Sequence, residues 1–324
     1  MSKRYAIVSI GTNSTRALLA DVEPDRPRTE LARSIGTRLG EGLGERGSLG
    51  DEPMQRTLDA VTQLSRAVRG HYVRLFAVGT SALRRAENGD AFVERVQEIL
   101  GVPVRILSGE EEAAASYRGA LTVLGDLRDA RVAVVDAGGG STECAVGTST
   151  EPEKVISCEI GAVRLTEAVP ALSGREGAVD KETISRARAI ASEALKPLSE
   201  YAPVERAALV GGTATTTAAI VRGRAVPIAS HTLKRADLQR TLDRLLKMTL
   251  DERKTVAGMR AQRADILPAG IIVLDAALET LGRDEGVATT SDLPLGILLQ
   301  ERDAVGGQRP VLSTESEMLK GYRE

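Results

Sequence analysis

Three short turns rich in glycine and hydroxyl residues carry the strongest chemical signal in this sequence. They lie at residues 11–14 (Gly-Thr-Asn-Ser), 138–141 (Gly-Gly-Gly-Ser) and 211–213 (Gly-Gly-Thr), and each follows an apolar, strand-like stretch. Glycine lets consecutive backbone N–H groups point into one concave site, and hydroxyls add donors, so such turns bind anions. One such turn also serves an ordinary hairpin, but three together indicate a phosphate chain gripped in a cleft. None is a P-loop, because none carries the lysine of that motif.

Carboxylates flank the second turn and also open a predicted helix before it. Asp136 ends the strand before the turn, and Glu143 starts the strand after it. Such a pair can hold Mg²⁺, which uses few protein ligands; alternatively, Glu143 is a surface strand residue. Residues 108–113 (Ser-Gly-Glu-Glu-Glu-Ala) begin a helix, where acidic residues ordinarily compensate the helix dipole. The functional alternative is that one glutamate projects into the cleft and accepts a proton from water.

Arginines near these turns are candidate phosphate ligands. Arg84 and Arg85 follow a strand and a Gly-Thr-Ser turn, while Arg260 and Arg263 precede an apolar helix. A guanidinium fork suits phosphate oxygens, although adjacent surface arginines are usually only solvated.

Composition narrows the class of ligand. Only 2% of the 324 residues are aromatic, which argues against recognition by base stacking. A net charge of −2 argues against a polycation that coats nucleic acid, so we expect no nucleic-acid polymer as a partner. Cys144 and Cys158 form no disulfide framework, and His71 and His231 lie in no metal-ligand spacing, which excludes a Cys/His zinc site.

Apolar periodicity predicts alternating strands and helices, with a mobile glycine-rich loop at residues 36–50. The predicted strands are 5–10, 17–22, 73–78, 102–107, 131–136, 142–147, 207–210 and 286–290. The predicted helices are one that opens at residue 51, then 90–100, 109–124, 181–201, 235–246 and 264–281.

The pattern restarts near residue 131. Placing Ser9 over Asp136 aligns the turn at residues 11–14 with the turn at 138–141, at a constant offset of 127 residues. This indicates an internal duplication; the alternative is chance similarity of two glycine turns. The fold class is therefore α/β with two related domains, predicted at residues 1–126 and 127–302. Residues 303–324 are rich in Gly, Pro, Ser and charge, and we expect a partly disordered tail.

Targeting signals are not evident. The N-terminus runs directly into a strand pattern, and no stretch reaches the roughly 18 apolar residues of a membrane helix. We expect a cytoplasmic protein with no membrane partner.

Taken in order, the motifs resemble the exopolyphosphatase and guanosine pentaphosphate phosphohydrolase (Ppx/GppA) family in its short, two-domain form. The similar stretches are residues 10–14, 37–42, 79–84, 108–113, 136–143, 211–213 and 263–270. The resemblance extends over roughly residues 4–300. It implies the fold of the actin-like, sugar-kinase and Hsp70 ATPase superfamily, with two duplicated ribonuclease H-like domains around a central cleft. It is also compatible with a homodimer.

The resemblance further implies a reaction and a set of site residues. The reaction is hydrolysis of the terminal phosphate of inorganic polyphosphate, or of the 5′ γ-phosphate of guanosine pentaphosphate, with Mg²⁺. Glu112 matches the family's catalytic glutamate, which would activate water, and Asp136 and Glu143 match its metal-side carboxylates. The predicted phosphate-binding residues are Thr12, Asn13, Ser14, Arg84, Gly138, Gly139, Gly140, Ser141, Gly212, Thr213 and Arg263.

The chain departs from the family pattern at two places. Ser9 stands where the family usually has Asp, which either weakens metal binding or reduces repulsion of an anionic substrate. After Asp292 the chain reads Leu-Pro-Leu-Gly, so an Arg-Glu pair of the family is missing. Ser9 favours one alternative, a non-catalytic sensor of polyphosphate or guanosine alarmones. Residues 211–213 favour another, a small-molecule kinase of the same superfamily. The scarcity of aromatic residues favours polyphosphate, because a guanine ring would benefit from an aromatic face.

Overall fold

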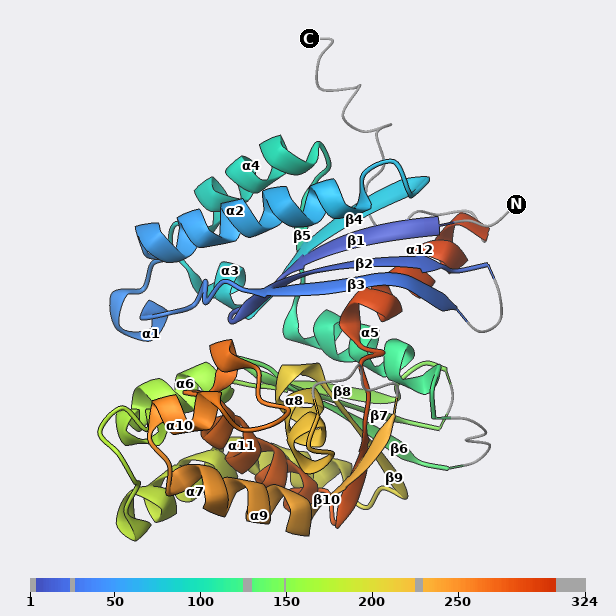
Figure 1. Cartoon of the computed structure of the whole chain (residues 1–324). Helices are drawn as coiled ribbons and strands as arrows, with labels where there is room; N and C mark the ends of the chain where they lie inside the picture. Colours follow the sequence, from blue (N-terminus) through green and yellow to red (C-terminus); the bar gives the residue numbers. More distant parts are fainter. Residues whose placement is uncertain (1–3, 24–26, 125–129, 149, 225–229, 307–324) are drawn as a thin grey trace.

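The computed structural model describes residues 4–23, 27–124, 130–148, 150–224 and 230–306, which form two sheets and their covering helices (Figure 1). The first sheet has the order β3-β2-β1-β4-β5. Its strands are β1 (Arg4–Ile10), β2 (Ser14–Asp21), β3 (Arg28–Gly36), β4 (Arg74–Gly79) and β5 (Val104–Ile106). The helices of this half are α1 (Leu43–Arg46), α2 (Asp51–Val68), α3 (Ser81–Arg85), α4 (Gly89–Leu100) and α5 (Gly109–Leu121).

The second sheet has the order β10-β11-β9-β6-β7-β8. Its strands are β6 (Val132–Ala137), β7 (Thr142–Gly147), β8 (Lys154–Cys158), β9 (Arg206–Val210), β10 (His231–Lys234) and β11 (Glu285–Ala288). The α-helices are α6 (Ala162–Ala168), α7 (Lys181–Leu195), α8 (Gly211–Val221), α9 (Arg235–Leu246), α10 (Leu250–Lys254), α11 (Leu267–Thr280) and α12 (Leu293–Gly306). Short 3₁₀ turns are η1 (Pro170–Ser173), η2 (Lys196–Tyr201) and η3 (Ala261–Arg263).

The duplication inferred from the sequence is visible in the strand pairing. In each half an antiparallel three-stranded meander (β1-β2-β3 or β6-β7-β8) is joined by a parallel strand, β4 or β9. Ser9 faces Arg16 across β1 and β2, and Asp136 faces Glu143 across β6 and β7, which preserves the 127-residue offset. Both hairpin turns close with the same 3.0 Å bond, from the amide at the first turn position to the carbonyl at the fourth.

The central strands of each sheet are buried on both faces, whereas the edge strand β3 is largely exposed. Neighbouring side chains of a strand point to opposite faces, so each central strand contributes to two clusters. On β1, Ala6 and Val8 pack with the cluster of α2 and α4, while Tyr5 and Ile7 face a cluster that includes Leu298 of α12. The second sheet packs on α7, α9 and α11 with one face and on α5 with the other.

The helices α5 and α12 are exchanged between the halves. Helix α5 follows the last strand of the first sheet but packs on β6, β7 and β8, whereas α12 follows β11 and packs on β1 and β2. They also pack on each other where the two halves meet (Figure 1). At their crossing, a Cβ on Gly119 would overlap the backbone of Asp292, and a Cβ on Gly296 would overlap the carbonyl of Ala115. Glycine at both positions lets the two backbones approach this closely.

Several boundaries differ from the sequence prediction. The strands β3, β8 and β10 and the helix α12 were not predicted as separate elements, and α5 ends at Leu121 rather than at residue 124. Helix α12 continues through Gly306, so residues 303–306 are helical and not part of a frayed tail. The expected junction at 126/127 and residues 307–324 lie outside the described residues. The domain limits at 1–126 and 127–302 therefore stay a proposal. In either domain one helix, α5 or α12, packs on the sheet of the other. No helix in the described parts of the chain has the length and hydropathy to cross a membrane.

Candidate active site

Glu112 is the one glutamate of its acidic cluster that points inward. Ser108 caps α5 by accepting from the Glu111 amide, and the Glu111 side chain returns a bond to the Ser108 amide, which forms a capping box. Glu110 is exposed, whereas only 6% of Glu112 is accessible. The helix terminus thus uses Glu111 for its own stability and leaves Glu112 for the space between the halves.

The Glu112 carboxylate is held by groups from α3. Arg84 donates from Nη1 to Glu112 Oε1 at 2.6 Å and to the Leu107 carbonyl at 2.5 Å. The Ser81 backbone amide also bonds the carboxylate. Burial raises the pKa of Glu112 to about 7, the nearby charge of Asp136 adds to the rise, and the hydrogen bonds and charge of Arg84 counter it. A buried carboxylate with this pKa can exchange a proton near neutral pH.

Asp136 and Glu143 form a second acidic pair, directly opposite each other on β6 and β7. Ser116 donates to Asp136 at 3.0 Å, and Ser157 donates to Glu143 at 2.8 Å. Burial raises the pKa of Asp136 to about 6, and the charge of Asp292 adds to the rise. Burial and the charges of Glu112 and Asp136 raise the pKa of Glu143 well above its usual range. The alternative that Glu143 is a surface residue is wrong, since only 3% of it is accessible.

The first and second turns meet in space. A Cβ built on Gly139 would lie 3.0 Å from Thr12 Cβ, and one on Gly140 would lie 3.0 Å from Thr12 Oγ1 and 2.8 Å from Ser81 Oγ. The Asn13 carbonyl accepts the amide of Thr37, just after β3, and the Gly139 carbonyl accepts the amide of Val163 in α6. Within the described residues, the amides of Thr12, Asn13, Gly139 and Gly140 donate to no backbone carbonyl. These amides are therefore available to an anion.

Side chains of the two turns differ in how they are satisfied. Asn13 is 4% accessible, and both polar atoms of its side-chain amide are buried without a partner among the described residues. Such a group calls for a ligand or water, because an unpaired buried amide is costly. Ser141 is buried and its hydroxyl bonds Glu143, whereas Ser14 is half-buried.

The third glycine sequence forms the start of α8 and contacts the second turn. Gly211 has φ of +81°, and a Cβ there would lie 2.5 Å from Asp136 Oδ1, so both backbone conformation and space favour glycine. A side chain on Gly212 would overlap the Arg263 guanidinium. Thr213 donates its hydroxyl to the Ala137 carbonyl at 3.2 Å. The structure thus gives Thr213 a structural partner, while Gly212 makes room for Arg263.

Three arginines gather around Asp136 and Asp292. Arg16 binds Asp292 through two bonds of 2.6 and 2.8 Å. Burial and the charges of Arg260 and Arg16 lower the pKa of Arg263 to about 10. Burial and the charge of Arg16 also lower the pKa of Arg260. Since Asp292 is already matched by Arg16, this region has positive charge that a polyanion can neutralise.

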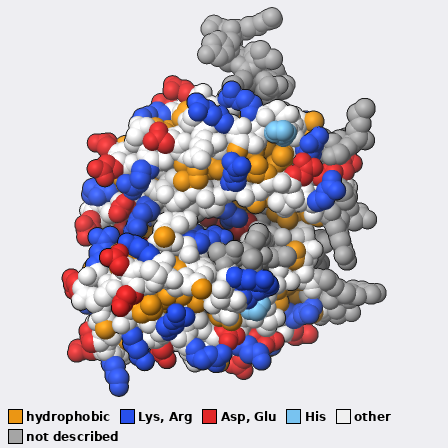
Figure 2. Space-filling model, in the orientation of Figure 1, with side chains coloured by type: hydrophobic (Ala, Val, Ile, Leu, Met, Phe, Trp, Pro, Cys, Tyr) orange, Lys and Arg blue, Asp and Glu red, His pale blue; other side chains and the backbone are white. Residues whose placement is uncertain are grey.

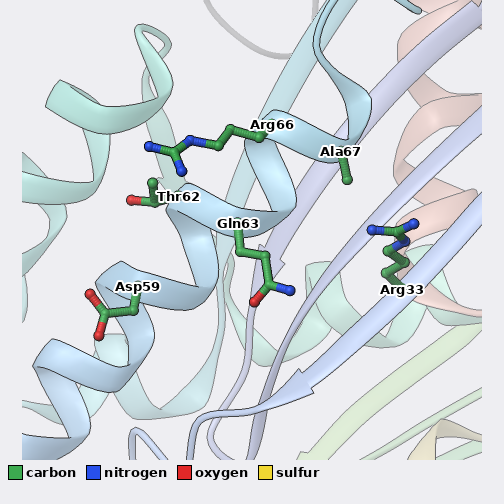
Figure 3. A pocket seen from close by; sticks show the side chains of 6 residues that line it. All are labelled: Arg33, Asp59, Thr62, Gln63, Arg66 and Ala67. Carbon is green, nitrogen blue, oxygen red and sulfur yellow. The ribbon is translucent and has the colours of Figure 1, made fainter.

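The surface between the two halves is hollowed, and Lys and Arg side chains gather along this recess (Figure 2). A different hollow of about 520 Å³ lies between β3 and α2 (Figure 3). It is lined by Arg33, Asp59, Thr62, Gln63, Arg66 and Ala67, none of which belongs to the acidic cluster or the turns. The candidate site is therefore the recess between the halves.

The structure assembles most of the predicted site and adds residues to it. The charge of Asp136 raises the pKa of Glu112, the charges of Glu112 and Asp136 raise that of Glu143, and the first two turns are in contact. Sequence reasoning missed Arg16 as a member of the site. The sequence did contain a signal for it: the 127-residue offset between the two halves places Arg16 at the position equivalent to Glu143. Ser116 and Ser157 carried no such signal.

Comparisons with known proteins agree with this arrangement. Residues 28–302 match the Ppx/GppA phosphatase family. Exopolyphosphatase 2 of Mycobacterium tuberculosis is 34% identical over 322 residues, which cover 91% of this chain and 98% of that protein. The guanosine-5'-triphosphate,3'-diphosphate pyrophosphatase of Vibrio parahaemolyticus is 30% identical over 311 residues, which cover 93% of this chain but 60% of that protein.

Solved structures agree as well. The Aquifex aeolicus member of the Ppx/GppA family is 27% identical, with a TM-score of 0.77 and full coverage of both chains. An exopolyphosphatase from Cytophaga hutchinsonii is 25% identical, with a TM-score of 0.84 and coverage of 93% of this chain and 98% of that one. The two sheets, their duplicated topology and this likeness identify the fold as the actin-like one. The chain belongs to the Ppx/GppA phosphatase family.

Proposed function

We propose that this protein is an exopolyphosphatase, which removes the terminal phosphate of inorganic polyphosphate by in-line attack of water. The observation that carries the proposal is the placement of Glu112. Its carboxylate is buried beside Asp136 and Glu143, held by Arg84 and the Ser81 amide, and has a pKa raised by burial to about 7. Phosphoryl transfer is mainly positioning and charge stabilisation, which is what such an arrangement supplies.

Glu112 acts as the general base. Arg84 and the Ser81 amide bond its carboxylate and fix its orientation, and the base accepts the proton of the attacking water. The Arg84 guanidinium bonds Glu112 and the Leu107 carbonyl, which adds a positioning role to the predicted phosphate-binding one. We propose that it positions the base and neutralises charge at the phosphoryl group from the same place.

The donor set at Asp136 and Glu143 fits Mg²⁺. Both are carboxylates, and they face each other across β6 and β7. Burial raises the pKa of each, with a further rise from the charge of Asp292 at Asp136 and from the charges of Glu112 and Asp136 at Glu143. No group of three or more His, Cys, Asp or Glu residues suited to a metal occurs in the described chain, so water and substrate oxygens would complete the shell. When bound, Mg²⁺ neutralises charge on the phosphoryl oxygens. Phosphatases of this family generally depend on a divalent metal.

The turns bind the terminal phosphoryl group, and Arg263 binds the phosphate groups that follow it. Amides of Thr12, Asn13, Gly139 and Gly140 surround the terminal phosphoryl group, with the hydroxyl of Ser14 at the edge. The remaining predicted phosphate ligands, Gly138, Ser141, Gly212, Thr213 and Arg263, shape this cradle or extend it. Arg263, over Gly212, leads toward the next phosphate groups of the chain.

Guanosine pentaphosphate is the second candidate substrate, because the Vibrio parahaemolyticus relative is named for a guanosine substrate. Polyphosphate is favoured by coverage: this chain spans 98% of the Mycobacterium tuberculosis exopolyphosphatase but 60% of the Vibrio protein. Phosphate release from long-chain polyphosphate, tripolyphosphate, guanosine pentaphosphate and ATP, with and without Mg²⁺, separates these substrates. A requirement for an acceptor with ATP would instead indicate a kinase, and binding without release would indicate a sensor.

The decisive variant is Glu112→Gln, with Glu110→Gln as a matched control on the same helical turn. Loss of the base is expected to lower phosphate release by about 10³-fold or more while polyphosphate still binds, whereas the exposed Glu110 is expected to be silent. Wild-type turnover by Glu112→Gln would reject the proposed role of this residue.

A further inference from the structure

Ser81 has a hydroxyl that the fold does not use. The residue begins α3, is 2% accessible, and its Oγ is buried with no hydrogen-bond partner among the described residues. A buried hydroxyl without a partner costs free energy, and such groups are rare in folded proteins. Replacing it by alanine would fill the same space, so packing alone does not account for it.

The position of this hydroxyl is specific. It lies so close to Gly140 that a Cβ there would come within 2.8 Å of Ser81 Oγ, and the same Cβ would be 3.0 Å from Thr12 Oγ1. Two hydroxyls from the first half therefore converge on the glycine turn of the second half. The amide of Ser81 meanwhile bonds Glu112. One residue thus touches both the base and the phosphate cradle.

We propose that the Ser81 hydroxyl is a further phosphate-binding group, which donates to a non-bridging oxygen of the phosphoryl group under attack. This inference rests on the proposed function. The Ser81 hydroxyl lies next to Glu112, on the side of the phosphoryl group from which the water attacks. We therefore expect its hydrogen bond to the phosphoryl oxygen to be strongest during that attack. A donor aimed at developing charge in a site of low polarity contributes more to the transition state than to ground-state binding.

The test compares Ser81→Ala with Ser65→Ala. Ser65 is a buried serine of α2 whose hydroxyl bonds the Thr62 carbonyl at 3.0 Å, so its loss is purely structural. Ser81→Ala is expected to lower kcat for polyphosphate by on the order of 10²-fold, with KM changed less than about threefold and no decrease in Tm. Ser65→Ala is expected to keep kcat and to lower Tm slightly.

A second readout separates a transition-state donor from a structural serine. Vanadate, which can adopt the five-coordinate geometry of phosphoryl transfer, and orthophosphate serve as inhibitors. Ser81→Ala is expected to raise the inhibition constant of vanadate about as much as it lowers kcat, and that of orthophosphate much less. If Ser81 had only a structural role, the inhibition constants of vanadate and orthophosphate would not diverge in Ser81→Ala.

The outcomes are distinguishable from failure of the proposed function, because Glu112→Gln is measured in the same assay. If Glu112→Gln is inactive and Ser81→Ala stays within twofold of wild type in kcat, the Ser81 assignment is overturned and the function stands. If Glu112→Gln keeps full activity, the proposed function itself fails. Equal loss of vanadate and orthophosphate affinity in Ser81→Ala would also overturn the assignment to the transition state.

Discussion

The hairpins β1–β2 and β6–β7 have the same framework and opposite chemistry. Their turns close with the same bond, and their strands keep the same register. At the two equivalent positions beside the turn, however, the first hairpin has Ser9 and Arg16, and the second has Asp136 and Glu143. A neutral residue and a cation thus occupy the places that hold two carboxylates in the other half.

This difference shows how a duplicated fold acquires one polar site. The charges of Glu112 and Asp136 raise the pKa of Glu143, and the charge of Asp292 raises that of Asp136. Arg16 instead binds Asp292, which comes from the loop before α12. The backbone repeat supplies two turns that can bind anions, and the side chains beside each turn give it a different function. The β6–β7 hairpin presents two carboxylates for a cation, and the β1–β2 hairpin presents the positive charge of Arg16.

The largest effect is expected from making the second half like the first, with Asp136→Ser. Serine is already accommodated at the equivalent register position by Ser9, so the strand should fold. Removing this carboxylate is expected to lower phosphate release by about 10³-fold, because charge neutralisation at the phosphoryl group is lost. The rate is measured across a range of Mg²⁺ concentrations.

The matched control is Ser9→Ala, which is expected to stay within about threefold of wild type. Equal losses of activity in Asp136→Ser and Ser9→Ala would show that both hairpins have the same function, and that the carboxylates of β6–β7 have no special role.

The next effect concerns α5 and α12, the equivalent helices that are exchanged between the sheets. Gly296→Ala places a methyl group on the Ala115 carbonyl and is expected to cost about 3 kcal/mol of unfolding free energy. Gly119→Ala meets the backbone of Asp292 and should cost a similar amount. Denaturant unfolding measures both.

The control for the glycine variants is Gly44→Ala, where a Cβ would approach only the flexible end of Glu167, at 3.3 Å. It should change stability by less than about 0.5 kcal/mol. Tolerance of Ala at 296 would mean that the helices do not cross as closely as the structure places them.

The sequence predicted the parts of this comparison that rest on local pattern. Alternating apolar residues and glycine turns located β1, β2, β6 and β7, and the constant offset gave their equivalence. The predicted helix at residues 235–246 matches α9. These elements were predicted correctly because their apolar periodicity and flanking turns lie within a few residues of one another in the sequence.

What the sequence did not predict depends on tertiary contact. Helix α12 was not predicted, and its packing on β1 and α5 explains its apolar residues. Glu111 and Glu112 are adjacent and chemically alike, so only the family resemblance singled out Glu112; the capping box and the bond from Arg84 supply the physical reason. Thr213 and Arg84 stay predicted phosphate ligands, but their protein partners, the Ala137 carbonyl and the Glu112 carboxylate, depend on tertiary contact and were not predicted.

A smaller effect is expected in the pH dependence of stability without metal or substrate. The folded pKa of Glu112, about 7, lies above its ordinary value of 4.5, so the native state holds the extra proton between these values. Stability therefore falls as pH rises from about 4.5 to about 7. Glu112→Gln should remove on the order of 2–3 kcal/mol of this fall.

The activity of the wild-type enzyme should rise over the same range, because the base must be ionised, with a midpoint near pH 7. Glu110→Gln again serves as the control, and its stability profile should follow that of the wild type. If the Glu112→Gln profile also followed the wild type, the raised pKa would belong to other groups of the cluster.

The smallest effect is expected from Ser9→Asp, which makes the first half like the second. Ser9 is 6% accessible and faces Arg16, whose guanidinium is already bound by Asp292. A new carboxylate there competes with Asp292 for one cation, so it gains little charge compensation and its burial costs about 1–2 kcal/mol of stability. The expected kcat is within threefold of wild type, with Ser9→Asn as the uncharged control of similar shape. A tenfold faster Ser9→Asp at low Mg²⁺, with no change in Ser9→Asn, would show that the serine limits metal binding and that the two hairpins work best when both are acidic.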